Sequence, residues 1–265
     1  MHTYKSLTED MASLGVKRDG VMLVHSSMKS IGEVEGRADT VLDVLMDYFK
    51  EDGLLVFPTL TWSNVNDRQP YYNVRETPSV VGILPQLFRQ RPGVRRSLHP
   101  THSLAAYGPE AEVFVEGHER FDSPAAMFSP WRRLVGLKAK ILFLGASIAH
   151  NTFLHGVEEW GHGFNILTES KQQLVSIDYD GRKIPVPSRR HLGGHSGYYA
   201  NLEPHFKAIG AWSEGHFGDA HCILLDAAKI ARFVIGLLAK YPAAFTDEWN
   251  KEHPSFFRET IPTIK

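Results

Sequence analysis

The stretch that decides the fold is VMLVHSSMKSIG, residues 21–32, in which a short apolar run passes directly into a polar loop. The same pattern recurs at Leu54–Phe57 and at Ile141–Leu144, where nearly unbroken apolar runs are followed by small polar residues. Such runs, without alternation, are typical of strands that are covered on both faces. We therefore expect a central, mostly buried sheet whose strand ends carry the functional loops.

Amphipathic helices are expected around these strands. Leu7, Met11 and Leu14 recur at helical spacing, and residues 39–50 carry one apolar stripe. Residues Cys222–Leu238 form the longest apolar stretch, which charged residues interrupt three times. We interpret it as one amphipathic helix packed on the core, because a membrane span would not contain these charges.

Residues Leu174–Ile184 alternate apolar and polar side chains around Asp180-Gly181, which predicts a β-hairpin. The predicted fold is therefore an α/β layered domain with a central, mostly buried sheet, helices on both faces and a small antiparallel hairpin appendage. No internal repeat or long linker divides the chain, so residues 1–265 are expected to form a single domain.

The composition excludes several classes of protein. The chain of 265 residues has 29 basic and 30 acidic side chains, which leaves no overall basic field for nucleic acid. One cysteine cannot form an internal disulfide, and no export signal or membrane span precedes the first helix, so a cytoplasmic location is expected. The 14 histidines are unusual, because histidine titrates near neutral pH and often binds metals.

Two strand-end loops are candidate ligand sites. Loop His25–Gly32 can offer backbone N–H groups, hydroxyls and a lysine to a phosphate, but it lacks the spacing of a P-loop. Its competing interpretation is an ordinary strand-to-helix connection. In Phe57–Trp62, the tryptophan could either hold a ligand or cover the core.

A third candidate is the segment Arg95–Ser103, which combines two arginines with serine, threonine and histidine. The arginines either bind a phosphate or carboxylate, or form a solvated face. His99 and His102 suggest a metal site, but Pro100 opposes a shared helical face and no partner ligand is near, so we expect no metal.

The fourth candidate is Asn151–Trp160. If Asn151 or Thr152 caps a helix, His155 and Glu158 lie three residues apart on one face. A carboxylate beside an imidazole fixes its tautomer and raises its proton affinity, which suits a general base and its orienting group. The alternative is an ordinary surface pair.

The remaining histidines and the cysteine give weaker signals. His191 and His195 lie in a glycine-rich loop, where a four-residue spacing implies no shared face. Cys222 has no evident activating cation and is interpreted as a buried, inert thiol.

In order along residues 7–165, these segments resemble the aminoglycoside 3-N-acetyltransferases, antibiotic N-acetyltransferases that do not have the GNAT fold. The matching elements are Val24-His25-Ser26-Ser27 with Gly32, Phe57-Pro58-Thr59, Pro78 through Gly82 to Arg89, Arg96-Ser97-Leu98-His99-Pro100 with Ser103, Asp122 with Ser129-Pro130, and Thr152-Phe153-Leu154-His155 with Glu158. The resemblance implies an α/β domain that binds acetyl coenzyme A and acylates a small-molecule amine.

The resemblance also implies roles for individual residues. A protonated amine must lose a proton before it attacks a thioester, so a general base is needed. His155 is the expected base, and Glu158 is expected to hold it in position. With Cys222 discounted, direct transfer is expected rather than an acyl-enzyme. The expected coenzyme-binding residues are His25, Ser26, Ser27, Met28, Lys29, Ser30, Gly32, Pro58, Thr59, Ser97, His99 and Ser103, and the expected acceptor-binding residues are Trp62, Asp122 and Glu159.

Two departures from the family pattern bear on the acceptor. Gln86 stands where the family usually has an acidic residue, and Ala125, Ala126 and Phe128 occupy a stretch that is usually glycine-rich. Phe128 is expected to narrow the pocket there. The chain has no acidic excess, so an amino sugar is at least as good an acceptor as a polycationic aminoglycoside. The alternatives are a coenzyme A-binding protein of this fold that has lost catalysis and, less favoured, a histidine-based metallohydrolase.

Overall fold

The computed structural model describes residues 1–163 and 165–259. Its strands form a seven-stranded sheet in the order β4-β5-β2-β1-β6-β10-β9 and a three-stranded sheet in the order β3-β7-β8. The strands are β1 (Val21–Ser26), β2 (Leu54–Pro58), β3 (Tyr71–Asn73), β4 (Arg95–Arg96), β5 (Leu104–Tyr107), β6 (Lys140–Leu144), β7 (Gln172–Ile177), β8 (Lys183–Ser188), β9 (Trp212–Phe217) and β10 (Ala220–Asp226).

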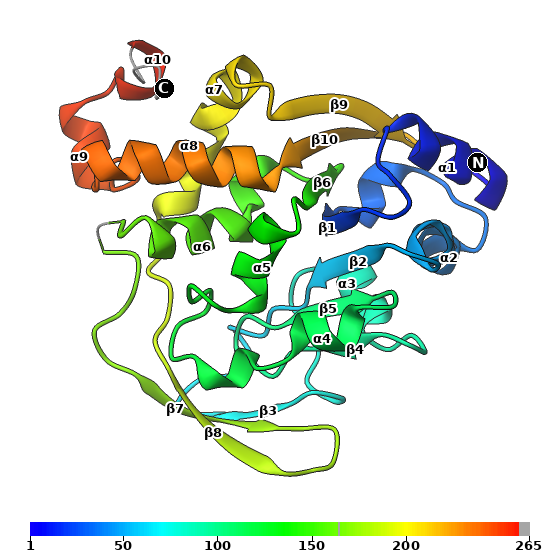
Figure 1. Ribbon diagram of the computed structural model, residues 1–265, viewed down its shortest axis with the longest axis horizontal. Coiled ribbons are helices and arrows are strands. Elements are labelled where there is room, and N and C mark those ends of the chain that lie inside the picture. The colour runs from blue at the N-terminus through cyan, green and yellow to red at the C-terminus, as the bar shows by residue number, and fades with distance from the viewer. Residues whose placement is uncertain (164, 260–265) are drawn as a thin grey trace.

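Helices surround the large sheet (Figure 1). The α-helices are α1 (Tyr4–Ser13), α2 (Arg37–Phe49), α3 (Ile83–Phe88), α4 (Ala111–Val115), α5 (Pro130–Gly136), α6 (Thr152–Trp160), α7 (Glu203–Ala208), α8 (Ala227–Lys240), α9 (Asp247–Glu252) and α10 (Phe256–Glu259). Short 3₁₀ turns are η1 (Met28–Ile31), η2 (His118–Arg120), η3 (Ile148–His150) and η4 (His195–Leu202). Within these described ranges, no helix is long and apolar enough to cross a membrane.

Strand β1 lies at the centre of the large sheet, between β2 and β6, and is parallel to both. Its side chains alternate between two cores: Leu23 packs with α4, α5, α6 and α8, whereas Met22 and Val24 pack with α1, α2 and α3. The strands that were predicted from the three apolar runs are therefore present, and the prediction of a buried sheet with helices on both faces is confirmed.

The predicted hairpin is formed by β7 and β8, which pair antiparallel. Strand β3 adds to it in parallel with β7, so the appendage is a three-stranded mixed sheet rather than a hairpin alone. Figure 1 shows this small sheet apart from the large one, along the lower edge of the view. Tyr72, Val74 and Leu174 form its own small core together with Val65.

The prediction of one helix over Cys222–Leu238 is wrong. Its first part belongs to β10, which pairs antiparallel with β6, and α8 begins only at Ala227. Asp226 is the N-cap of α8, since its carboxylate accepts a hydrogen bond from the Lys229 backbone N–H at 3.0 Å. A buried strand and a buried helix are both apolar, so periodicity did not reveal the boundary.

Candidate active site

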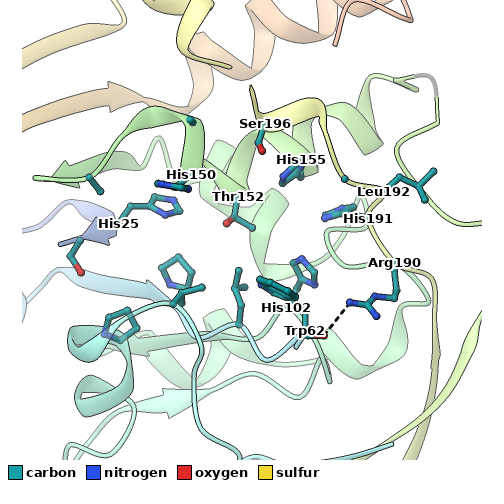
Figure 2. A pocket seen from close by; sticks show the side chains of 18 of the residues that line it. His25, Trp62, His102, His150, Thr152, His155, Arg190, His191, Leu192 and Ser196 are labelled. Carbon is teal, nitrogen blue, oxygen red and sulfur yellow. Dashed lines mark hydrogen bonds between the residues drawn. The ribbon is translucent and has the colours of Figure 1, made fainter. Parts of the chain in front are cut away.

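A cavity of about 640 Å³ opens where β1, β2 and β6 reach their carboxyl ends. Ends of parallel strands are where α/β sheets bind ligands. The strand ends contribute His25, Ser26 and Pro58, and α6 contributes Thr152 and His155. The loop after β8 supplies residues 190–194, so three distant parts of the chain meet at this cavity (Figure 2).

His155 is held by its Nδ1 nitrogen. Tyr199 Oη lies 2.7 Å from this nitrogen and itself donates a short hydrogen bond to Glu158 Oε2, which lies 3.4 Å from His155 Nδ1. Because the Tyr199 proton goes to Glu158, the oxygen accepts the proton on His155 Nδ1. In the neutral imidazole this places the proton on Nδ1 and leaves Nε2 as the acceptor nitrogen, and the ring lines the cavity.

Glu158 is an ionised anchor for this group. Its side chain is 1% exposed, and its second oxygen lies 2.6 Å from His195 Nδ1. Burial by itself would raise the pKa of Glu158, but its favourable interactions with His155 and His195 outweigh burial and lower it. Burial and Glu158 raise the pKa of Tyr199, so the phenol keeps the proton that it donates.

A second histidine and carboxylate lie beside the first pair. Glu159 Oε1 is 2.6 Å from His191 Nε2 and 2.9 Å from the Ala125 backbone nitrogen, and its other oxygen accepts from Ser123. Burial raises the pKa of Glu159 to about 7. The His191 ring lines the cavity, with its centroid 5.0 Å from that of His155. Glu159 was expected to bind the acceptor, but it lies behind His191 and does not line the cavity.

Of the expected coenzyme-binding residues, three line the cavity: His25, Ser26 and Pro58. The His25 ring stacks on Phe143 at 4.8 Å, and burial lowers its pKa to about 3, so this imidazole is neutral. His25 Nε2 and Ser26 Oγ are buried atoms, and neither has a hydrogen-bond partner in the described chain.

The rest of the first loop lies next to the cavity without lining it; these residues are Ser27, Met28, Lys29, Ser30 and Gly32. Their placement has a structural cause. Ser30 Oγ donates to Ser27 Oγ at 2.9 Å and approaches the Gly145 carbonyl at 3.1 Å, so both hydroxyls are engaged within the protein.

Four other expected coenzyme-binding residues are fully buried and do not reach the cavity: Thr59, Ser97, His99 and Ser103. Their polar atoms are bonded to the protein; for example, Ser97 Oγ lies 2.9 Å from His118 Nδ1, and His99 Nε2 lies 3.1 Å from Ser188 Oγ. Thr59 and Ser103 both accept from the Arg96 guanidinium at 3.1 Å. Arg96 is itself buried, so it neither meets a ligand nor forms a solvated face.

Of the residues that were expected to bind the acceptor, one lines the cavity and another lies outside it. Trp62 lines the cavity and is 45% exposed. Asp122 lies outside it, where it pairs with Lys171 at 2.6 Å and Arg189 at 3.1 Å. Asp122 is therefore neutralised by its neighbours and is not presented to an acceptor.

The two departures from the family pattern also lie away from the cavity. Gln86 Oε1 accepts from the Ser79 backbone and from Arg89 Nε, and Phe128 is 75% exposed on the surface. Neither side chain narrows the site, so neither supports a loss of catalysis.

Sequence reasoning missed His191, His195 and Tyr199. All three lie in or after the glycine-rich loop that follows β8, and they meet α6 only through the tertiary fold. The local sequence contained no signal for this arrangement, because His191 and His195 contact Glu159 and Glu158 of the distant helix α6 rather than each other. The repeated His and Tyr in HLGGHSGYY were the only trace.

The other chemical expectations concern metal and thiol. No group of three or more His, Cys, Asp or Glu side chains is arranged to hold a metal ion within residues 1–163 and 165–259. Cys222 is buried as expected, and burial raises its pKa to about 12, so it is not a ready nucleophile.

Comparison with known proteins places this site in a family. The family model described as aminoglycoside 3-N-acetyltransferase matches residues 23–239. Aminoglycoside N(3)-acetyltransferase III from Salmonella sp is 32% identical over 273 residues, which cover 91% of this chain and 93% of that protein.

Two solved structures are similar over almost their whole length. AAC-IIIb, solved as a binary complex with CoASH, has a TM-score of 0.79 at 25% identity, covering 91% of this chain and 98% of that one. A histidine-to-alanine mutant of aminoglycoside acetyltransferase AAC(3)-IVa in complex with a gentamicin has a TM-score of 0.75 at 26% identity, covering 92% and 91%. The chain belongs to the aminoglycoside 3-N-acetyltransferase family.

Proposed function

We propose that this protein transfers an acetyl group from acetyl coenzyme A directly to a primary amine of an aminoglycoside or amino sugar. The observation that carries the proposal is the state of His155, whose Nδ1 is held by Tyr199 and Glu158 while its ring lines the cavity. Two similar proteins support the reactants, since one was solved with CoASH and the other with a gentamicin.

The chemistry assigns a step to each group. His155 Nε2 takes a proton from the amine, whose nitrogen attacks the thioester carbonyl. The tetrahedral intermediate then collapses, the C–S bond breaks, and the proton passes from His155 to the leaving sulfur. Ionised Glu158, linked through Tyr199, stabilises the imidazolium that exists between these two transfers.

Direct transfer is supported by the state of the thiol. A covalent acyl-enzyme needs an activated nucleophile, and the single cysteine of the chain is buried with its pKa raised to about 12. Mixing the enzyme with acetyl coenzyme A alone should therefore give no burst of released thiol. A stoichiometric burst would contradict direct transfer while leaving the overall reaction intact.

The decisive test is His155→Ala, assayed by release of the coenzyme A thiol over a panel of aminoglycosides and amino sugars. Loss of the general base should reduce kcat by about 10²- to 10⁴-fold. His216→Ala is the matched control, because His216 is exposed on β9 and does not line the cavity. Equal rates in wild type and His155→Ala would reject the assignment of the base.

A further inference from the structure

The cavity has an unusual set of charged and titratable side chains. Among its described lining residues there is one arginine, Arg190, and no aspartate or glutamate; the other titratable residues are His25, His102, His150, His155 and His191. Glu158 and Glu159 are buried behind His155 and His191 and are bonded to them. A polycationic acceptor would therefore find no free carboxylate in the cavity, and its ammonium groups would face a guanidinium.

Arg190 has no acidic partner within the described chain. Its Nη2 donates to the Trp62 carbonyl at 3.1 Å, and this is the hydrogen bond that its side chain makes there. The neighbouring Arg189 differs, since it pairs with Asp122 outside the cavity. An arginine carries five N–H donors, so most of those on Arg190 are free to bind a ligand.

Arg190 lies at the end of the cavity that is away from the expected coenzyme-binding residues. Figure 2 shows Arg190 beside Trp62 at one end of the cavity and His25 at the other, with Thr152 and His155 between them. Ser26 and Pro58, which with His25 are the expected coenzyme-binding residues of this cavity, belong to the strand ends at the His25 end. A group bound at Arg190 therefore lies on the opposite side of the general base from these residues.

We infer that Arg190 binds an anionic group of the acceptor, so that the preferred substrates are amines that also carry a phosphate or a carboxylate, such as amino sugar phosphates. The planar guanidinium can bind either anion with two parallel hydrogen bonds. The exposed face of Trp62 offers an apolar surface to the sugar ring beside it. The inference rests on the proposed function and specifies the substrate class of the same site.

The test compares glucosamine with glucosamine 6-phosphate, two acceptors that differ by one phosphate. We expect wild type to have the higher kcat/KM for glucosamine 6-phosphate. Arg190→Gln should reduce that value by about 10- to 100-fold, as for loss of a charge-assisted hydrogen bond, and change the value for glucosamine little. Arg189→Gln is the matched control and should retain the preference. Equal kcat/KM for both sugars in wild type would overturn the inference.

Arg190 could bind a phosphate of the coenzyme by the same hydrogen bonds as a phosphate of the acceptor. A second part of the experiment therefore compares acetyl coenzyme A with acetyl-pantetheine, which has no phosphate. If Arg190 serves the acceptor, Arg190→Gln leaves the KM for acetyl coenzyme A unchanged. If the substitution instead raises that KM, leaves acetyl-pantetheine unaffected and preserves the preference for glucosamine 6-phosphate, then Arg190 binds the coenzyme and the inference is wrong.

Direct binding separates this inference from the proposed reaction. Calorimetric titration of the two sugars into wild type, without acetyl coenzyme A, should show tighter binding of glucosamine 6-phosphate, and Arg190→Gln should abolish the difference. Tighter binding without thiol release on any amine would reject the acetyl transfer and retain the anion site. Thiol release with equal binding of both sugars would retain the acetyl transfer and reject the anion site.

Discussion

In the proposed mechanism, Tyr199 determines which nitrogen of His155 acts as the base, because its oxygen lies between His155 Nδ1 and Glu158. In Tyr199→Phe the imidazole and the carboxylate would be left 3.4 Å apart without the bridging hydroxyl. We expect kcat to fall by about 10- to 100-fold, as for loss of a hydrogen bond to a charged group, with a smaller change in the KM of the amine. The acidic limb of the kcat profile, where a general base becomes protonated, reports the change in His155.

Tyr198→Phe is the control for that experiment. The Tyr198 hydroxyl donates to Asp247 on the surface at 2.7 Å and takes no part in the hydrogen bonds around His155. Its removal should leave kcat and its pH dependence unchanged. If both phenylalanine variants behave alike, the bridge to Glu158 has no catalytic role.

Glu159 predicts a second effect, on stability rather than rate. Burial raises its folded-state pKa from 4.5 to about 7, so the protonated form is favoured in the native protein. This contribution is fully present below pH 4.5 and is lost as the pH rises through 7. Glu159→Gln does not titrate, so between pH 4.5 and 7 its free energy of unfolding should gain about 3 kcal/mol relative to wild type. Urea unfolding at about pH 5 and pH 8, on either side of the raised pKa, measures the change, and parallel profiles would contradict it.

At the scale of elements, two glycines with similar φ values differ in their surroundings. Gly32 ends η1 with φ +85 and ψ −158, a conformation that is nearly restricted to glycine, and a Cβ there would lie 2.0 Å from Asp219 Oδ2. Gly181, in the hairpin turn with φ +81, has no heavy atom within 4 Å of such a Cβ.

Replacement by alanine should therefore destabilise the two elements unequally. Gly181→Ala should cost about 1 kcal/mol from backbone strain alone and leave activity unchanged. Gly32→Ala should cost about 2–3 kcal/mol, because strain and displacement of Asp219 add. Thermal unfolding midpoints compare the two, and equal shifts would show that Asp219 yields without cost.

The same scale explains what the sequence predicts well. Val21–Val24 and Ile141–Leu144 could be predicted as strands, because a short apolar run between polar loops is typical of a strand buried on both faces. By contrast, β10 and α8 form one continuous apolar stretch, and the boundary between them depends on the pairing of β10 with β6. His155 and Glu158 could be predicted together because helical spacing is local. His195 could not, because its contact with Glu158 is made by a loop 37 residues away in sequence.

For the whole molecule, Arg96 joins the two sheets beneath the cavity. Its guanidinium donates to Thr59 and Ser103 on the side of the large sheet and to the Val74 and Thr77 carbonyls that follow β3. Pro58 and His102, which line the cavity, directly precede Thr59 and Ser103. Arg96 is thus a buried cation that connects the small sheet to the wall of the candidate active site, in addition to hydrogen bonds such as that between Ser188 and His99.

Arg96→Met tests this connection. The substitution preserves much of the buried volume but leaves several interior oxygens without a donor, so the free energy of unfolding should fall by about 3–5 kcal/mol. For a chain of this size that corresponds to a decrease in Tm of about 10 °C. Arg95→Met is the adjacent control, since Arg95 is exposed and meets Glu112 only at 3.5 Å; it should change stability by about 0.5 kcal/mol or less. Calorimetry of both variants gives the comparison, and equal Tm values would show that the sheets are held together without Arg96.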